Sequence, residues 1–426
     1  MQQILDLHIH SKYSRACSKN LTLENLDKAC RIKGVDIIAT GDFTYPEWFK
    51  SIKEELEEMP GRRGTVSSPS GLYKLKTASD DKVKFILSTE FALIYKDGGK
   101  CRRIHLVVHA PNIQAVEELN KYLDKHYNIR SDGRPILGMS AKDLFKLCLS
   151  IHPKFLIYPA HIWTPWFSVF GSKSGFDKLE ECFGEYTSQV YAYETGLSSD
   201  PEMNWRVSEL DRLTLLSNSD AHSPQNIARE ANVFDLETNT YDEIYEAIKN
   251  KDLKKIKYSI EFYPEEGMYH YDGHRACGVS FTPEQTKKLK SICPVCKKPL
   301  TVGVMYRVDE LADRPFGFKP KNVASFKKLV ELDKIIAESL NVKSRSSQKV
   351  QTIYQNLIKK LGNELLILLD ADLKEITEAS DGRIAEGVRR VRAGELKIEP
   401  GFDGEYGKVE IFSKKEKDKK QLELFN

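Results

Sequence analysis

Short apolar runs alternate with longer amphipathic segments over the first 255 residues of the chain. Seven runs of roughly five to seven residues are rich in β-branched and aromatic types, which is typical of buried strands. They lie at residues 4–10, 35–40, 85–89, 104–108, 155–160, 190–194 and 213–217. Segments with helical spacing, such as residues 23–33 and 115–126, separate most of them. The alternation predicts an α/β fold built on a parallel sheet or barrel.

The pattern changes character three times after residue 255. Residues 256–310 carry a cluster of Cys and His, and we expect a small zinc-binding module there. Residues 311–412 have helical periodicity and end in a Gly-rich hairpin signal, so they predict a mainly helical C-terminal domain. Residues 413–426 form a charged run followed by a short apolar motif, which is typical of a flexible tail.

Composition narrows the class of protein. The chain has 426 residues, 40% hydrophobic and 30% charged, which excludes a fully disordered or fibrous chain. Its 65 Lys and Arg against 62 Asp and Glu leave a charge of +3, so any nucleic-acid surface must concentrate its cations locally. Eight Cys are too few for a disulfide scaffold. Without a signal-peptide pattern or an apolar run of about 18 residues, we expect a cytoplasmic protein that does not enter the membrane.

Imidazoles and carboxylates lie close to the predicted strands. His8 and His10 alternate on the first strand, so both rings point to the same face and can reach one ion or two adjacent ions. Asp220 and His222 form a second pair with the same spacing. Such donors suit Zn, Mn or Fe, and two adjacent ions suit phosphoester hydrolysis. Further donors close to the strands are Glu90, His105 and His161.

The combined motifs resemble the PHP (polymerase and histidinol phosphatase) superfamily. The residues that carry this resemblance are Asp6-Leu7-His8-Ile9-His10-Ser11, Thr40-Gly41-Asp42, Glu90, His105-Leu106-Val107-Val108, Ala160-His161 and Ser219-Asp220-Ala221-His222. The resemblance covers roughly residues 1–255. It implies a distorted seven-stranded (β/α)7 barrel with a phosphoesterase site that holds two or three divalent metals.

The resemblance also implies a set of metal ligands. We expect Zn, Mn, Mg or Fe to be bound by His8, His10, Asp42, Glu90, His105, His161, Asp220 and His222. Two positions depart from the superfamily pattern, because Arg15 and Phe43 stand where many members have an acid and a histidine. His109 is the alternative to His105. The role of Glu194 stays open between a ligand, a general base and a charge that orients a ligand.

A longer resemblance runs through most of residues 1–412, to the endonuclease Q family of PHP-type DNA repair nucleases. It rests on Pro159-Ala160-His161 with Thr164-Pro165-Trp166, on residues 194–200, 217–225 and 270–274, and on residues 307–314. The family implies hydrolysis of DNA on the 5′ side of deaminated bases (uracil, hypoxanthine, xanthine) and of abasic sites. We expect 3′-hydroxyl and 5′-phosphate ends. A phosphatase of a small phosphate ester and a non-catalytic DNA-binding scaffold are the alternatives.

The Cys cluster predicts a structural zinc site. Cys293 and Cys296 are spaced so that both thiolates can bind one tetrahedral Zn²⁺. Cys277 and His274 would complete four ligands, with His270 as the substitute for His274. Such a closed site stabilises a small module that lacks a core of its own.

Several residues beside the predicted ligands are candidates for DNA contacts. Lys12 and Arg15 follow the first histidine pair and can meet phosphate, or they are a solvated surface pair. Reading a damaged base requires taking it out of the stack, into a pocket with aromatic walls and polar edges. Residues 161–170 could supply both through Trp163, Trp166 and Ser168. Ordinary aromatic core is the alternative for this segment.

The tail carries a partner motif. Gln421, Leu422, Leu424 and Phe425 match the QLxLF peptide that binds bacterial DNA sliding clamps. A flexible terminus can reach such a pocket without disturbing the fold. The motif therefore predicts a clamp partner, a bacterial source and a nucleoid-associated location.

Overall fold

The computed structural model describes residues 1–61, 69–413 and 416. The predicted clamp-binding residues Gln421, Leu422, Leu424 and Phe425 lie outside this part of the chain. The chain divides into two compact units, each described by itself below. Unit 1 holds Met1–Arg31, Val35–Ile260 and Val304–Phe326, and unit 2 holds Ile32–Gly34, Glu261–Gly303 and the chain from Lys327 onward. Residues 304–326 therefore return to unit 1, whereas the sequence predicted boundaries at 255 and 310.

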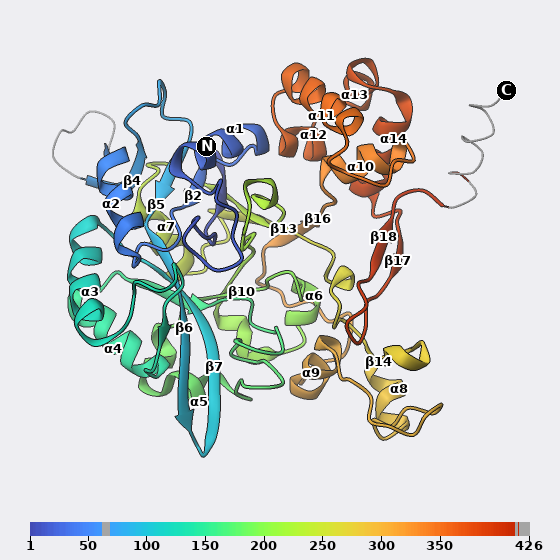
Figure 1. The fold of residues 1–426 in the computed structure, drawn as a ribbon, viewed down its shortest axis with the longest axis horizontal. Helices are drawn as coiled ribbons and strands as arrows, with labels where there is room; N and C mark the ends of the chain where they lie inside the picture. The colour runs from blue at the N-terminus through green and yellow to red at the C-terminus, as the bar shows by residue number, and fades with distance from the viewer. Residues whose placement is uncertain (62–68, 414–415, 417–426) are drawn as a thin grey trace. The chain divides into compact units, whose positions relative to one another are not determined.

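Unit 1 alternates strands and helices as the sequence predicts (Figure 1). Its strands are β1 (Gln2–Asp6), β2 (Ile37–Ala39), β3 (Leu56–Pro60), β4 (Pro69–Leu75), β5 (Lys84–Ile86), β6 (Ser88–Asp97), β7 (Lys100–His109), β8 (Ile136–Leu137), β9 (Leu156–Pro159), β10 (Ala192–Glu194), β11 (Thr214–Leu216), β12 (Ala231–Asp235) and β13 (Ile256–Glu261), with β16 (Ser325–Lys328) at its boundary. Its helices are α1 (Leu23–Lys33), α2 (Pro46–Glu55), α3 (Ile113–His126), α4 (Ala141–Ile151), α5 (Leu179–Phe183), α6 (Pro201–Asn204), α7 (Tyr241–Lys249) and α9 (Val304–Leu311). All seven predicted runs overlap a strand.

The strands do not form one continuous parallel ladder. The described residues form an eight-stranded sheet of order β16-β13-β12-β1-β2-β5-β4-β3, a four-stranded sheet of order β8-β6-β7-β9 and the pair β10-β11. The strands β1, β2 and β5 are parallel, as are β10 and β11. The expectation of parallel strands is wrong for β6 and β7, which pair antiparallel over ten positions. The reason is their two-residue connection, Gly98-Gly99, because only antiparallel strands can be joined so tightly.

Backbone hydrogen bonds between the strand ends link the three sheets into a ring. The amide of Phe43, after β2, donates to the carbonyl of Ser88 in β6 at 3.2 Å, and the amide of Ile162, after β9, donates to the carbonyl of Glu194 in β10 at 3.0 Å. The amide of His10 donates to the carbonyl of Ala221 at 3.2 Å, which joins the first strand to the segment after β11. The carboxyl ends of β1, β2, β9, β10 and β11 therefore face one mouth.

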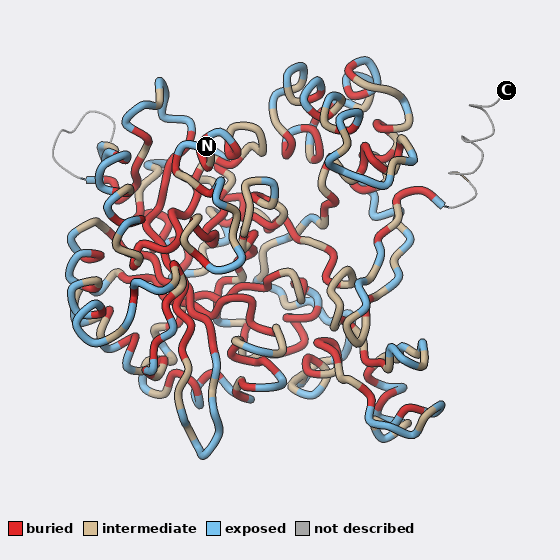
Figure 2. Tube along the Cα trace, viewed as in Figure 1, coloured by how far each residue is buried: buried red, intermediate tan, exposed pale blue. Residues whose placement is uncertain are grey.

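The core of unit 1 lies along these strands, where buried residues concentrate (Figure 2). Leu5, Ile37, Phe85, Leu106 and Ile157 are at most 1% exposed. Burial on both faces explains why their runs are continuously apolar rather than alternating. Within the described residues, no helix combines the length and the apolar character that a bilayer crossing needs.

Unit 2 contains a small Cys-rich segment and a group of short helices. Its strands are β14 (Asp272–His274), β15 (Val279–Phe281), β17 (Lys397–Glu399) and β18 (Lys408–Glu410). Its helices are α8 (Pro283–Lys288), α10 (Leu332–Ser339), α11 (Gln348–Leu361), α12 (Glu364–Leu369), α13 (Leu373–Ala379) and α14 (Gly382–Ala393). The side chains of Ser347, Asn363, Asp372 and Asp381 accept hydrogen bonds from first-turn amides, which explains where four of these helices begin. The predicted hairpin near residue 400 is the antiparallel pair β17-β18.

Candidate metal centre

Two groups of potential metal ligands meet at the mouth of unit 1. His8, His10 and Asp220 form one group, and the other consists of Glu90, His105 and His161. Within each group the ligand atoms lie within 4.8 Å of one another. The structure therefore brings together six of the eight residues that the sequence predicted as ligands.

The backbone is strained where it delivers these side chains. His161 has a φ of 28° and Asp220 a φ of 45°, both in the left-handed region that non-glycine residues rarely adopt. Gly196 packs directly on His161, since a Cβ added to it would lie 2.4 Å from the Cβ of His161. Such conformations persist only where the surrounding structure imposes them, and they concentrate at functional sites.

The first group fits a bound cation. The Nε2 atoms of His8 and His10 and the Oδ1 atom of Asp220 are buried, yet they have no hydrogen-bond partner. The Nε2 of His10 lies 3.1 Å from the Oδ1 of Asp220, and the Nε2 of His8 lies 3.8 Å from it. Buried polar atoms without partners are costly, and a metal ion would satisfy all three.

Glu90 lies at the centre of the second group. Its Oε1 is 2.8 Å from the Nδ1 of His105 and 3.2 Å from the Nε2 of His161. Its Oε2 is 3.4 Å from the Nε2 of His10, so one carboxylate reaches both groups. A carboxylate in this position suits a bridge between two adjacent ions.

Glu194 and Asp42 lie behind the histidines. Glu194 is fully buried, with an Oε2 that is 3.0 Å from the Nδ1 of His8 and accepts a hydrogen bond from Asn218 at 3.1 Å. Asp42 lies 3.2 Å from the Nδ1 of His10, and its other oxygen accepts hydrogen bonds from the amide and hydroxyl of Ser11. Carboxylates in this position fix the tautomer and orientation of metal-ligating histidines. For Asp42, the geometry favours that orienting role over the ligand role that the sequence predicted. For Glu194, it favours a charge that orients a ligand over a ligand or a general base.

The electrostatics of the site favour a cation. Burial lowers the pKa of His8, but the nearby carboxylate of Glu194 outweighs it and raises this pKa to about 9. Burial also opposes ionisation of Glu90, yet the neighbouring His105 and Arg134 hold the pKa of its carboxyl well below the usual range. Burial lowers the pKa of His105 to about 4, so its ring is neutral and keeps a lone pair at neutral pH.

Two other histidines lie at the edge of this arrangement. The Nδ1 of His222 is 2.8 Å from the carbonyl of Asp220, and its side chain is 32% exposed. His222 is therefore beside the first group but outside it. His109, the alternative to His105, is buried elsewhere, with its Nε2 3.1 Å from the hydroxyl of Tyr158.

Arg134 is a functional candidate that the sequence analysis missed. Its guanidinium donates to the Oε2 of Glu90 at 2.9 Å, which places a permanent positive charge beside the ligands. Arg134 lies in the loop before β8, away from the end of any strand that the hydrophobic pattern predicted. The turn-forming Ser131-Asp132-Gly133 that precedes it marks a loop but does not show where the loop packs.

The candidate DNA contacts divide into buried and exposed residues. Trp163 is fully buried and donates its Nε1–H to Asn204 at 2.7 Å, so the prediction that it lines a base pocket is wrong. Ser168 is also buried, and its hydroxyl donates to the carbonyl of His161 at 2.6 Å. Trp166 is 45% exposed. Arg15 is exposed, and Lys12 lies 5.2 Å from the centre of the Tyr13 ring.

The four predicted zinc ligands of unit 2 also come together. The ligand atoms of His274, Cys277, Cys293 and Cys296 lie within 4.8 Å of one another, and the Sγ of Cys296 is 3.6 Å from the Nδ1 of His274. The backbone amide of Cys296 lowers the pKa of the Cys293 thiol, which favours a thiolate. This donor set fits a closed tetrahedral Zn²⁺ site. His270, the predicted substitute, is not part of the group.

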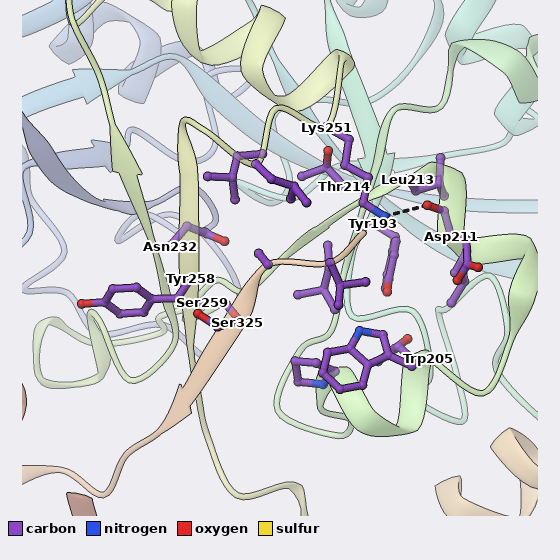
Figure 3. Close-up of a pocket in the computed structure, with 18 residues that line it drawn as sticks. Tyr193, Trp205, Asp211, Leu213, Thr214, Asn232, Lys251, Tyr258, Ser259 and Ser325 are labelled. Carbon is purple, nitrogen blue, oxygen red and sulfur yellow. Dashed lines mark hydrogen bonds between the residues drawn. The ribbon is translucent and has the colours of Figure 1, made fainter. Parts of the chain in front are cut away.

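A different kind of pocket lies against β10, β11 and β13 in unit 1 (Figure 3). It has a volume of about 30 Å³, which is room for one or two water molecules. Tyr193, Trp205 and Leu213 line it, and Lys251 donates to the carbonyl of Asp211 at its edge. None of the described metal-ligand groups borders this pocket, so the mouth of unit 1 is the candidate site.

Two protein-family models match parts of the chain. The family described as PHP-associated matches residues 205–253, and the MJ0043 C-terminal domain matches residues 331–395. The uncharacterized protein MJ0043 of Methanocaldococcus jannaschii is 34% identical over 254 residues, which are 58% of this chain. The match spans 31% of that relative's length.

Two solved structures resemble nearly the whole chain. The lesion-specific endonuclease PfuEndoQ from Pyrococcus furiosus has a TM-score of 0.83 and 29% identity, covering 96% of this chain and 95% of its own. A complex of endonuclease Q with a 27-mer duplex substrate that has an abasic lesion at the active site has a TM-score of 0.81 and 30% identity. That likeness covers 97% of each chain.

Proposed function

Because this chain belongs to the endonuclease Q family of PHP-type, metal-dependent DNA endonucleases, we propose that it cleaves DNA beside damaged nucleotides. The proposed substrates are duplexes with a deaminated base, namely uracil, hypoxanthine or xanthine, or with an abasic site. The observation that carries the proposal is the pair of ligand groups that converge at the mouth of unit 1, in a fold that matches endonuclease Q along its length.

The proposed metal ligands are the residues of the two groups together with His222, which lies beside the first group. His8, His10 and Asp220 would hold one ion, and His105 and His161 a second, with Glu90 between them. Divalent ions held by these residues would supply Lewis-acid polarisation of a phosphoryl oxygen and would lower the pKa of a water molecule. Glu194 and Asp42 accept hydrogen bonds from the Nδ1 atoms of His8 and His10, which leaves the Nε2 lone pairs directed into the site.

The proposed reaction is a direct hydrolysis. Water oxygen forms a bond to phosphorus, the bond from phosphorus to the 3′ oxygen breaks, and that oxygen takes a proton. The products are a 3′-hydroxyl and a 5′-phosphate, with the cut on the 5′ side of the lesion. Arg134 adds positive charge beside Glu90, where negative charge builds up on the phosphoryl group.

Selectivity for damage would follow from the cost of extruding a base. Unstacking costs a few kcal/mol and is easiest where pairing is already weakened, as at a mismatch or an abasic site. The exposed ring of Trp166 follows His161 by five residues and is the proposed stacking surface for an unpaired base.

Two further proposals concern the rest of the chain. The group of His274, Cys277, Cys293 and Cys296 is proposed to hold one structural Zn²⁺, because its four donor atoms converge in a segment with few buried apolar residues.

The tail is proposed to bind a bacterial sliding clamp through the motif at residues 421–425, which would raise the local concentration of enzyme on DNA. Recovery of a clamp by the full chain but not by a chain ending at Lys420 would support this, and equal recovery would refute it.

A panel of substrates tests the main proposal. The metal-loaded protein is incubated with labelled duplexes that contain uracil, an abasic site or no lesion, and with a small phosphomonoester. We expect incision of the damaged duplexes and little of the others. Preferred hydrolysis of the phosphomonoester would instead identify a phosphatase, and binding without hydrolysis would identify a scaffold.

A further inference from the structure

The strands β6 and β7 form a long hairpin in unit 1 (Figure 1). A groove of about 980 Å³ lies beside this hairpin. The hairpin forms one wall, and the segment after Trp166 forms another. Six of the described lining residues are Lys or Arg and four are Asp or Glu. The groove therefore has an excess of positive charge, although the whole chain is nearly neutral.

Two of the six cations are committed to holding the groove together. The guanidinium of Arg102 donates to the carbonyl of Gly175 and lies 4.0 Å from the centre of the Phe176 ring. Arg307 donates to Asp177 at 2.5 Å and to Glu310 at 2.6 Å. These pairs account for two of the four acids, so four cations remain against two acids and the groove keeps its excess of positive charge.

The other four cations make no ion pair within the part of the chain that the structure describes. Among the described residues, the side chains of Lys100, Arg103, Lys142 and Lys173 form no ion pair or hydrogen bond. Lys100, Arg103 and Lys173 are exposed, and Lys142 is half-buried. Lysines and arginines that share one groove repel one another, and an anion bound between them would relieve that repulsion.

The backbone that lines the groove also carries a residue of the metal centre. Arg103 and His105 are two residues apart on β7, so their side chains share a face of the hairpin about 7 Å apart. The amide of His105 donates to the carbonyl of Phe167 at 2.9 Å, and the amide of Arg103 donates to Ser174 at 3.3 Å. The segment that carries Trp166 is thereby held alongside the strand that carries a proposed ligand.

We propose that this groove holds the phosphate backbone of the lesion-bearing DNA strand where it leaves the metal centre. The inference rests on the proposed function and adds the path of the substrate. Lys100, Arg103, Lys142 and Lys173 contact phosphates without reading sequence. Trp166, which lines the groove and follows His161 by five residues, receives an unpaired base.

Salt dependence of binding provides the test, because each phosphate contact contributes about 0.9 to the slope of log K against log salt concentration. Binding is measured with an undamaged labelled duplex, which the intact metal-loaded protein leaves uncut. The test variant combines Arg103→Ala with Lys173→Ala, and a second combines Lys100→Ala with Lys142→Ala. The control combines Lys121→Ala with Lys125→Ala, two exposed lysines on α3 that remove the same charge outside the groove.

In each groove variant, the slope of log K against log salt concentration should be smaller in magnitude by about 1.8. When the salt is raised from 50 to 200 mM, the affinity of the wild type should therefore fall about twelvefold more than that of the variant. The control variant should keep the wild-type slope and single-turnover incision rate, because its two lysines lie outside the groove and the metal centre. A slope equal to that of the control, with incision preserved, would overturn the groove alone. Absence of incision by the wild type would overturn the proposed function, while the slopes would still decide whether the groove binds DNA.

Discussion

Replacing Glu194 by Gln separates an orienting role from a catalytic one. The substitution keeps the shape of the side chain and an oxygen that can accept the Nδ1–H of His8, but it removes the negative charge 3.0 Å from that ring. The negative charge of Glu194 supports the basicity of the His8 Nε2 atom, which would bind the metal. Loss of such an outer carboxylate typically costs about 10- to 100-fold in metal affinity, or about 1.4–2.8 kcal/mol.

A general base would behave differently. Its loss lowers the rate of the chemical step by about 10²- to 10⁴-fold, whatever the metal concentration. We therefore expect Glu194→Gln to need about 10- to 100-fold more metal for half-maximal incision, yet to approach the wild-type rate at saturation.

The assay is single-turnover incision of a uracil duplex across a metal titration, together with calorimetric titration of metal into the apoprotein. Glu118→Gln, on the exposed face of α3, is the matched control and should change neither curve. A rate that stays low at saturating metal, with unchanged metal affinity, would refute the orienting role and restore the general base.

Three further substitutions test other parts of the account. Cys293→Ser with Cys296→Ser should remove one zinc per chain by metal analysis and lower the melting temperature; unchanged zinc content would reject the structural site. Gly196→Ala should destabilise unit 1 by about 2–5 kcal/mol in denaturant titration, since it combines left-handed strain with a Cβ contact of 2.4 Å. Gly98 has a similar φ and open space around it, so Gly98→Ala should show the cost of the backbone strain alone. Equal losses of stability in Gly196→Ala and Gly98→Ala would show that the contact with His161 contributes nothing. Trp166→Ala should reduce the preference for damaged over normal DNA more than it reduces metal binding; an unaltered preference would remove this ring from base recognition.

Each of the seven predicted runs overlaps a strand of unit 1, because apolar β-branched runs carry a strong local signal, but the sequence did not predict β3, β4, β8, β12 or β13. It could not predict the direction of β7, since periodicity is the same for parallel and antiparallel strands. That direction explains how His105, in the middle of its strand, reaches the same mouth as His161. Because β7 pairs antiparallel with β9, the carboxyl end of β7 points away from the mouth, and His105 lies beside the carboxyl end of β9.

The candidate ligands were predictable for a similar reason, and their supporting residues were not. Motifs identify which side chains offer donor atoms, whereas the contact of Glu194 with His8 or of Asp42 with His10 depends on how distant segments meet. Arg134 escaped notice because it lies on a loop without a metal motif. The aromatic segment shows the same limit, because only the fold distinguishes the buried Trp163 from the exposed Trp166.

The central claim is that the ligand groups at the mouth of unit 1 hydrolyse DNA beside a lesion. Its most direct test maps the products from a duplex with one uracil, cut by the metal-loaded wild type and by Asp220→Ala. We expect one cut on the 5′ side of the uracil, with 3′-hydroxyl and 5′-phosphate ends, that is lost in the variant and after chelation of the metals. Incision at the same position by a folded Asp220→Ala protein would contradict it.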